Sequence, residues 1–157
     1  MSRHLRCAAP QRRPRVSVVI PCYNYGHYLP DAVGSVLSQE LVETDVIVVD
    51  DKSTDDSLAV AEQLAASRPR VRVIAHAVNR GHIATYNDGL DAVTGDYTVL
   101  LSADDLLTPG ALGRAVRLME AEPEVGFVYG HPVSFRDTPP AARTRTRSWT
   151  VWRGEEW

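Results

Sequence analysis

The sequence predicts an α/β protein with a doubly wound, mostly parallel sheet and helices on both faces. Two observations carry this prediction. Five short apolar segments begin at residues 16, 45, 71, 97 and 125, a spacing that fits one strand plus one crossover helix. The segments are rich in Val, Ile and Leu without polar alternation, as expected for parallel strands covered by helices on both faces.

Five strands are expected, and four helices fit between them. In the fourth strand, "YTVLLS", the unbroken Val-Leu-Leu run predicts burial on both faces. The intervening segments place apolar residues at helical spacing, for example Ile83, Leu90 and Val93 in the third helix. The expected strands are 16–20, 45–50, 71–76, 97–102 and 125–130, and the expected helices are 28–39, 53–67, 82–95 and 108–123. Together they predict one α/β domain over residues 16–135.

The N-terminal segment differs in charge from the rest of the chain. Residues 1–15 contain five arginines and no acid, although the whole chain has a net charge of −3. We expect a disordered basic tail there, either as a solubilising leader or as a peripheral contact with an anionic membrane. The acidic remainder argues against nucleic acid as a partner, because phosphate binding needs a basic face.

The composition also indicates where in the cell the protein is expected. The apolar runs are far shorter than the roughly 20 residues that span a bilayer, and no signal peptide is recognisable. Cys7 and Cys22 cannot form a disulfide framework, so we expect a reducing cytoplasmic location, at the inner membrane face if the tail binds lipid. Sixteen arginines against one lysine hint at a GC-rich bacterial source.

Polar residues follow the first four strands directly. The strands are followed by "PCYNYGHY", "DDKST", "NRGH" and "SADD". The carboxyl ends of parallel strands meet at one edge of a sheet, so one acidic crevice is expected there. Such a crevice suits Mg²⁺ or Mn²⁺, which binds one or two carboxylates and completes its shell with water and phosphate oxygens. The plainer alternatives are loop acids before a helix N-terminus for Asp50 and Asp51, and a turn residue for Asn24.

Three longer stretches resemble the nucleotide-sugar-binding half of a family 2 glycosyltransferase, which has the GT-A fold. They are "VSVVIPCYNYGHYLPDAVGSVLSQ", "DVIVVDDKSTDDS" and "NRGHIATYNDGLDAVTGDYTVLLSADDLLTPGAL". They match the successive motifs of that family in order and at suitable spacing, over residues 16–130. Several motifs in series make this resemblance more specific than any short pattern.

The resemblance implies site residues. It places Pro21, Tyr23 and Asn24 beside the nucleotide base and Asp51 in contact with the base or ribose. It makes Asp104 the ligand of Mn²⁺ or Mg²⁺, with Asp105 as a second candidate. One departure is that the "SAD" of this chain lacks the first acid of the family's DxD motif. The implied nucleotide-sugar-binding residues are Pro21, Tyr23, Asn24, Asp50, Asp51, Asn79, Gly81, Asn87, Ser102, Ala103 and Asp104.

The implied reaction is a metal-dependent, inverting hexosyl transfer from a nucleoside-diphosphate sugar, with a UDP-sugar favoured, to an unidentified acceptor hydroxyl. The family's general base lies in the acceptor half, so no catalytic base is assigned in this chain. Residues 136–157 are expected to be the start of a truncated acceptor-side region. Trp149, Trp152 and Trp157 suggest a surface covered by a partner, for example in a homodimer.

Two other functions compete with this one. The first is a non-catalytic nucleotide-sugar-binding module, or the remnant of such an enzyme. The second is a phospho-acceptor signalling domain, which needs a carboxylate pair after the first strand and a lysine near the last. Lys52, the only lysine, follows the second strand instead, which disfavours the signalling domain.

Overall fold

The computed structural model describes residues 12–130, 132–136, 138–140 and 150. These residues form a four-stranded parallel sheet in the order β3-β2-β1-β4. The strands are β1 (Arg15–Cys22), β2 (Glu43–Asp50), β3 (Val71–Ala75) and β4 (Tyr97–Leu100). The helices are the 3₁₀ helix η1 (Gly26–Tyr28) and the α-helices α1 (Leu29–Leu37), α2 (Ser57–Ser67), α3 (His82–Asp91) and α4 (Ala111–Ala121).

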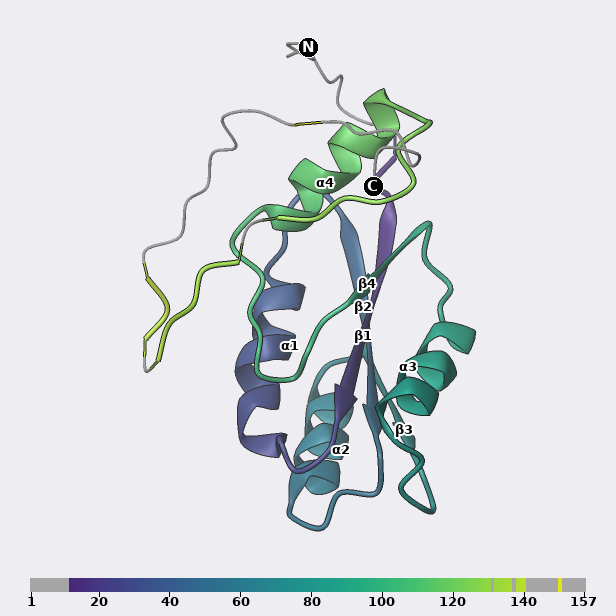
Figure 1. Ribbon diagram of the computed structural model, residues 1–157, viewed down its shortest axis with the longest axis vertical. Coiled ribbons are helices and arrows are strands. Elements are labelled where there is room, and N and C mark those ends of the chain that lie inside the picture. Colours follow the sequence, from purple (N-terminus) through teal and green to yellow (C-terminus); the bar gives the residue numbers. More distant parts are fainter. Residues whose placement is uncertain (1–11, 131, 137, 141–149, 151–157) are drawn as a thin grey trace.

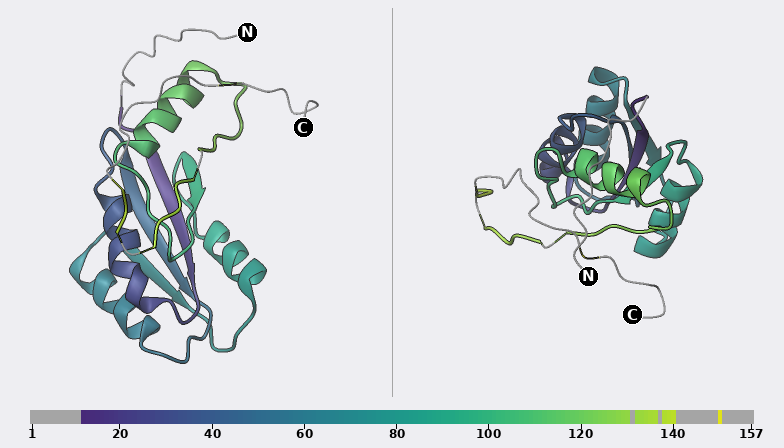
Figure 2. Two further views of the ribbon diagram at one scale, coloured as in Figure 1. Left: turned by 60° about the vertical axis from the view of Figure 1, so that its left-hand side comes forward. Right: turned by 90° about the horizontal axis from the view of Figure 1, so that it is seen from above.

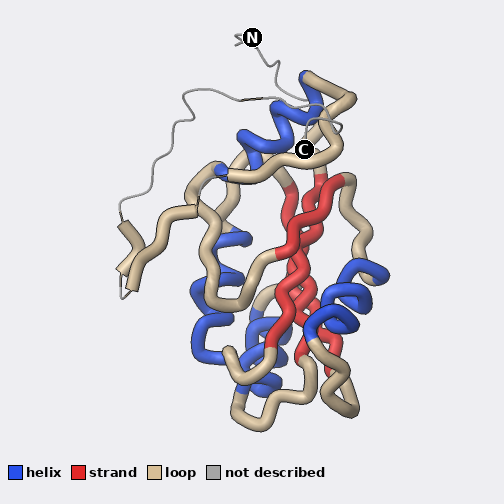
Figure 3. The backbone as a smooth tube through the Cα atoms, viewed as in Figure 1, coloured by secondary structure: helices blue, strands red, loops and turns tan. Residues whose placement is uncertain are grey.

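Helices cover both faces of the sheet. Figure 1 shows α1 and α2 on one side and α3 on the other, and Figure 3 shows the strands as the layer between them. Helix α4 crosses near the end of the sheet where β1 begins, as the views in Figure 2 also show. The predicted doubly wound α/β architecture is therefore confirmed.

The two central strands divide their side chains between two apolar layers. Val18 and Ile20 of β1 pack with α1 and α2, whereas Val19 points to the layer under α3. All three side chains are fully buried. This arrangement follows from the two-residue period of a strand, and it explains why β1 and β2 show no polar alternation.

Helix α3 approaches the sheet closely, and its buried face differs from the predicted one. A Cβ atom on Gly89 would lie 2.2 Å from Cγ1 of Val19, so this position tolerates only glycine without a shift of the helix. The buried residues of α3 are Thr85 and Gly89. The predicted stripe through Ile83 and Leu90 is wrong, because Ile83 is 69% exposed and Leu90 is also exposed.

Two of the predicted strands differ in the structure. β4 ends at Leu100 and lies at the edge of the described sheet, where its burial alternates, so the prediction of burial on both faces is wrong. Residues 125–130 form no strand. A strand needs a pairing neighbour and a buried face, and this segment has neither: Phe127 is 74% exposed.

The ends of the chain are described only in part. β1 begins at Arg15, inside the predicted tail, and Arg12 forms an ion pair with Asp96 at 2.7 Å. Residues 1–11 and most of 136–157, including Trp149, Trp152 and Trp157, lie outside the described residues, so the predictions for them stay predictions. Within the described ranges, no helix combines the length and hydropathy needed to cross a bilayer.

Candidate nucleotide-binding site

The carboxyl ends of three strands lie level with one another. Cys22 of β1 pairs with Asp50 of β2, and Asp50 pairs in turn with Ala75 of β3. The loops that follow these strands are therefore neighbours. The sheet order also reverses between β1 and β4, and ligands bind at such switch points in open α/β sheets.

Asp51 anchors the loop that follows β3. Its Oδ1 accepts a hydrogen bond from the backbone N–H of Arg80 at 2.7 Å, and its Oδ2 accepts one from Gly81 at 2.8 Å. His76 Nδ1 also lies 2.7 Å from Oδ1. Burial alone would raise the pKa of Asp51, but the hydrogen bonds from Arg80, His76 and Gly81 outweigh it and lower the pKa. The carboxylate is therefore ionised at neutral pH and turned into the protein.

Asn79 and Gly81 complete this loop. Asn79 donates from Nδ2 to the backbone oxygen of Asp51 at 3.1 Å, and its Oδ1 accepts the N–H of Gly81 at 3.2 Å. Gly81 has φ +79° and ψ 159°, a conformation that is essentially restricted to glycine. The predicted residues Asp51, Asn79 and Gly81 are thus brought into direct contact.

His76 and Asp88 belong to the same cluster, although the sequence did not point to them. The His76 side chain is 5% exposed, and its Nε2 lies 2.8 Å from Asp88 Oδ2, at ion-pair distance but without hydrogen-bond geometry. Arg80 also pairs with this oxygen of Asp88. His76 is the last residue of the predicted strand 71–76, so its position at a strand end could have marked it as a candidate site residue. Asp88 lies in α3, and only the tertiary fold brings it near.

Asn24 joins the loop after β1 to the loop after β2. Its backbone has φ +60°, its N–H donates to Ser53 Oγ at 3.0 Å, and its Oδ1 accepts the N–H of Thr54 at 2.8 Å.

Asp50, the last residue of β2, has one satisfied and one unsatisfied carboxylate oxygen. Its Oδ2 accepts a hydrogen bond from the N–H of Ser53 at 3.1 Å. Asp50 is only 1% exposed, yet its Oδ1 has no hydrogen-bond partner among the described residues. A buried carboxylate oxygen without a partner is costly, and this atom and His76 Nε2 are the two buried polar side-chain atoms of the cluster without a hydrogen-bond partner among the described residues.

Exposed aromatic rings lie beside Asn24. The side chains of Tyr23, Tyr25 and Tyr28 are all more than two-fifths exposed, and the Tyr25 and Tyr28 ring centroids are 5.5 Å apart. Pro21 is half-buried in β1, past the point at Val19 where pairing with β4 stops. A proline is tolerated there because no ladder hydrogen bond to β4 is lost.

The turn after β4 is built differently. The N–H of Asp105 donates to the backbone oxygen of Ser102 at 3.0 Å, Ala103 is buried, and Asp104 and Asp105 are exposed. The following segment is held against α1 by a hydrogen bond from Leu107 N–H to Ser35 Oγ at 3.0 Å.

Neither the turn nor Asn87 joins the Asp51 cluster directly. In the part of the chain that the structure describes, no hydrogen bond or ion pair links Asp104 or Asp105 to that cluster. Asn87 is exposed on α3. The shared crevice of Asp51 and Asp104 therefore stays a prediction.

The acids of this turn fit a hard divalent cation. The described residues contain no group of three or more His, Cys, Asp or Glu side chains that would hold a metal by themselves. Mg²⁺ and Mn²⁺ do not require one, since one or two carboxylates suffice when water and phosphate supply the other oxygens. Asp104 and Asp105, adjacent and exposed, match that donor set.

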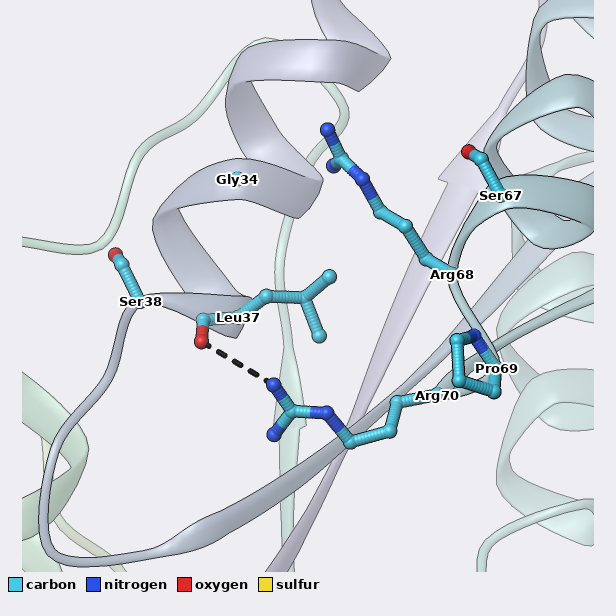
Figure 4. A pocket seen from close by; sticks show the side chains of 7 residues that line it. All are labelled: Gly34, Leu37, Ser38, Ser67, Arg68, Pro69 and Arg70. Atoms are coloured by element: carbon cyan, nitrogen blue, oxygen red, sulfur yellow. Dashed lines mark hydrogen bonds between the residues drawn. The ribbon is translucent and has the colours of Figure 1, made fainter.

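A hollow of about 580 Å³ lies away from these loops, at the C-terminal ends of α1 and α2 (Figure 4). Arg70 donates to the backbone oxygen of Leu37 there at 3.5 Å. Cations are favoured at helix C-termini, which explains the arginines. None of the predicted site residues lines this hollow; its lining residues are Gly34, Leu37, Ser38, Ser67, Arg68, Pro69 and Arg70.

The fold and the loops at its carboxyl edge define a doubly wound domain of the kind that binds nucleotides at a switch point. The family model "Glycosyl transferase family 2" matches residues 17–156. The chain therefore belongs to glycosyltransferase family 2, and the predicted family is confirmed.

Curated relatives share the same region. An uncharacterized glycosyltransferase of Nostoc sp. is 37% identical over 116 residues, which cover 73% of this chain and 36% of the relative. The chondroitin synthase of Escherichia coli is 36% identical over 108 residues, which cover 69% of this chain and 16% of the synthase. The chain spans about a third of the length of the first relatives that it matches.

Solved structures confirm the fold. A mannosyltransferase of Pyrobaculum calidifontis, in complex with GDP-Man and Mn²⁺, matches 74% of this chain and 35% of its own, with a TM-score of 0.66 and 29% identity. TarS of S. aureus, residues 1–349 in complex with UDP-GlcNAc, matches 77% of this chain and 37% of its own, with a TM-score of 0.62 and 24% identity.

Proposed function

We propose that this chain is the donor-binding part of a glycosyltransferase that takes a nucleoside-diphosphate sugar, with a UDP-sugar favoured. The observation that carries the proposal is the polar cluster at the carboxyl edge of the sheet. In a family 2 domain, it combines loops that three strands hold in register with one buried carboxylate oxygen, Asp50 Oδ1, that has no protein partner among the described residues.

The cluster suits the nucleoside. Asp50 Oδ1 is an acceptor that has no donor among the described residues, and Asn24, Asn79 and Gly81 fix the loops of the cluster. The exposed ring of Tyr23 offers an apolar face to the base. Asp51 holds the loop before α3 in place by accepting hydrogen bonds from the backbone N–H groups of Arg80 and Gly81.

The diphosphate is assigned to the turn after β4. Asp104, with Asp105 beside it, would hold Mn²⁺ or Mg²⁺, and Ser102 adds a hydroxyl without a charge. A bound divalent cation supplies Lewis-acid stabilisation of the negative charge that develops on the departing diphosphate. The Pyrobaculum mannosyltransferase, solved in complex with GDP-Man and Mn²⁺, supports a site that takes a nucleotide sugar together with a divalent cation.

In the proposed inverting transfer, the bond from the anomeric carbon to the phosphate oxygen breaks, and the diphosphate leaves with the electron pair. The acceptor oxygen forms the new bond on the opposite face and gives its proton to a carboxylate of the acceptor half. No residue of this chain is assigned as that base, and the acceptor is not specified. The rival function is a nucleotide-sugar-binding module without turnover, which the named relatives do not favour.

Calorimetry with UDP and GDP, each with and without Mn²⁺, tests the proposal. We expect metal-dependent binding, tighter for UDP, that Asp104→Asn reduces at least tenfold. Asp91→Asn, which changes an exposed acid at the end of α3, is the matched control and should bind normally. Equal affinity with and without metal would overturn the metal assignment, and no binding of either nucleotide would overturn the proposal itself.

A further inference from the structure

The hollow between the last turns of α1 and α2 lies far from the nucleotide-binding loops (Figure 4). Helix α1 connects the carboxyl end of β1 to the amino end of β2, and α2 connects β2 to β3 in the same way. The last turns of both helices therefore lie at the amino edge of the sheet, opposite the edge that carries Asp50 and Asp51. The volume of about 580 Å³ is within the range of small-molecule pockets.

Two arginines are the only charged residues among those that line this hollow. Arg68 is the C-cap of α2 and Arg70 precedes β3, and Figure 4 shows both side chains extending toward α1. Neither guanidinium forms an ion pair with an acid in the part of the chain that the structure describes. The two helix ends offset only part of the two positive charges, because each end carries about half a negative charge. The hollow therefore has a net positive charge.

The two guanidinium groups are held differently. Arg70 donates from Nη1 to Thr44 Oγ1 at 3.2 Å and from Nη2 to the backbone oxygen of Leu37 at 3.5 Å. The Arg68 guanidinium makes no hydrogen bond with the described residues, and its Nη1 is shielded from solvent. A buried charged nitrogen without a partner is costly. Rotation of this side chain toward the hollow breaks no hydrogen bond, so Arg68 gains a partner at little cost when an anion enters.

We propose that this hollow binds a phosphate group, with Arg68 as the main donor and Arg70 as the second. A guanidinium donates two parallel hydrogen bonds to phosphate oxygens, and such charge-assisted bonds are stronger than neutral ones. A phosphomonoester carries about −1.5 to −2 charges at neutral pH, which matches two arginines better than one carboxylate does. The hydroxyls of Ser38 and Ser67 already donate to backbone oxygens of their own helices, so the arginines supply the recognition.

The first test uses inorganic phosphate as the probe, on the full chain, without divalent metal and at constant ionic strength set with chloride. Backbone ¹H–¹⁵N spectra should show saturable shifts at Leu37, Ser38 and Ser67, and none at Gly81 in the nucleotide-binding loops. Arg68→Gln should weaken the binding about tenfold or more, as expected for the loss of a hydrogen bond to a charged group. The variant should fold, because the Arg68 guanidinium makes no hydrogen bond with the described residues.

Arg72→Gln is the matched control, because it removes the same charge from the other face of the sheet. Val71 and Val73 of β3 pack in the layer under α1 and α2, whereas Arg72 donates to the backbone oxygen of Ala92, after α3, at 2.9 Å. This variant should bind phosphate as wild type does. Equal losses in Arg68→Gln and Arg72→Gln would mean that phosphate responds to net charge alone, and would overturn the proposal.

The second test separates the two sources of a phosphate group, a lipid headgroup and a soluble compound. Flotation compares vesicles of phosphatidylcholine alone with vesicles that also contain phosphatidic acid, whose headgroup is a phosphomonoester. Binding to phosphatidic acid that Arg68→Gln loses and Arg72→Gln keeps assigns the site to a lipid headgroup. Saturable phosphate shifts together with vesicle binding that Arg68→Gln leaves unchanged assign it to a soluble compound.

The proposal is overturned if wild type shows neither saturable phosphate shifts at the hollow nor vesicle binding that depends on Arg68. Neither test contains a nucleotide or a divalent metal. The outcome is therefore independent of the proposed function, which stands or fails with the binding of UDP and GDP at the other edge of the sheet.

Discussion

The chain uses a pair of adjacent aspartates at two strand ends, with opposite results. Asp50 ends β2 and Asp51 follows it, and they are 1% and 4% exposed. Asp104 and Asp105 follow β4 on an exposed turn. Backbone N–H groups donate to three of the four carboxylate oxygens of the first pair, whereas the second pair faces solvent. Burial, rather than residue type or position after a strand, therefore separates an acid that organises a loop from an acid that is free to bind an ion.

This difference has a physical basis. A buried carboxylate must have its charge balanced by nearby donors, and once it does, it holds those donors in place. Asp51 does so for the N–H groups of Arg80 and Gly81. An exposed carboxylate retains its water, which a divalent cation can replace at little cost. The two pairs should consequently respond in opposite ways to mutation, with stability lost at one and binding lost at the other.

The largest expected effect is on stability at Asp51. Asp51→Ala leaves the buried His76 and two backbone N–H groups without their acceptor, and each buried donor left unsatisfied costs about 1–3 kcal/mol. Asp104→Ala should change the free energy of unfolding by no more than about 0.5 kcal/mol, as for most exposed substitutions. Urea unfolding of both variants measures the contrast. Equal losses at the two positions would show that the turn after β4 is also a structural anchor.

A second contrast comes from two glycines with positive φ, one in the loop that Asp51 holds and one at the start of α4. Gly81, with φ +79° and ψ 159°, gives its N–H to Asp51, and Gly110, with φ +70° and ψ 12°, precedes α4. Gly81→Ala should cost about 1–3 kcal/mol, because its conformation is open essentially only to glycine. Gly110→Ala enters the ordinary left-handed region and should cost about 1 kcal/mol.

Chemical denaturation of Gly81→Ala, Gly110→Ala and wild type measures which of the two substitutions lowers the free energy of unfolding more. The added Cβ at Gly81 meets no atom within 4 Å, so a loss there reports backbone strain and not a clash. A Gly110→Ala variant that loses more than Gly81→Ala would mean that the start of α4, and not the Asp51 loop, is the more constrained turn.

Much of the fold was predictable from the sequence, because β1 and β2 are buried and their apolar runs have no competing explanation. The predictions failed where burial was incomplete. Ile83 and Leu90 have helical spacing, but α3 needs the small residues Thr85 and Gly89 against the sheet, since only they allow the close approach to Val19. Phe127 lies in an apolar segment that has no strand to pair with.

The site residues that directly follow a strand were predictable from the sequence. Asp51, Asn79 and Gly81 were expected together because parallel strands end at one edge, and the structure joins them. His76 and Asp88 were missed, since a single histidine and a mid-helix acid carry no pattern in the sequence. Their pairing depends on the angle at which α3 crosses the sheet, which periodicity does not give.

The smallest expected effect is a pH dependence that separates the two regions. The pKa of Asp51 is lowered, so its contribution to stability is present above the unfolded value near 3.9 and is lost as the pH falls through the folded value. At the start of β4, at the other end of that strand from the Asp104 turn, burial and the hydrogen bond that Tyr97 donates to Glu120 Oε1 raise the pKa of Tyr97 to about 12. Its contribution is therefore complete below the unfolded pKa of about 10 and is lost as the pH rises toward 12.

Unfolding free energies measured along both pH limbs resolve the two contributions. Asp51→Asn should flatten the acid limb and leave the alkaline limb unchanged, whereas Tyr97→Phe should flatten only the alkaline limb and cost about 1 kcal/mol at neutral pH, the usual net value of one hydrogen bond. Tyrosinate absorbance in wild type should show one group that ionises late. If Asp51→Asn altered the alkaline limb as well, the loop that Asp51 holds and the start of β4 would be coupled through the sheet, and the two contributions would not be independent.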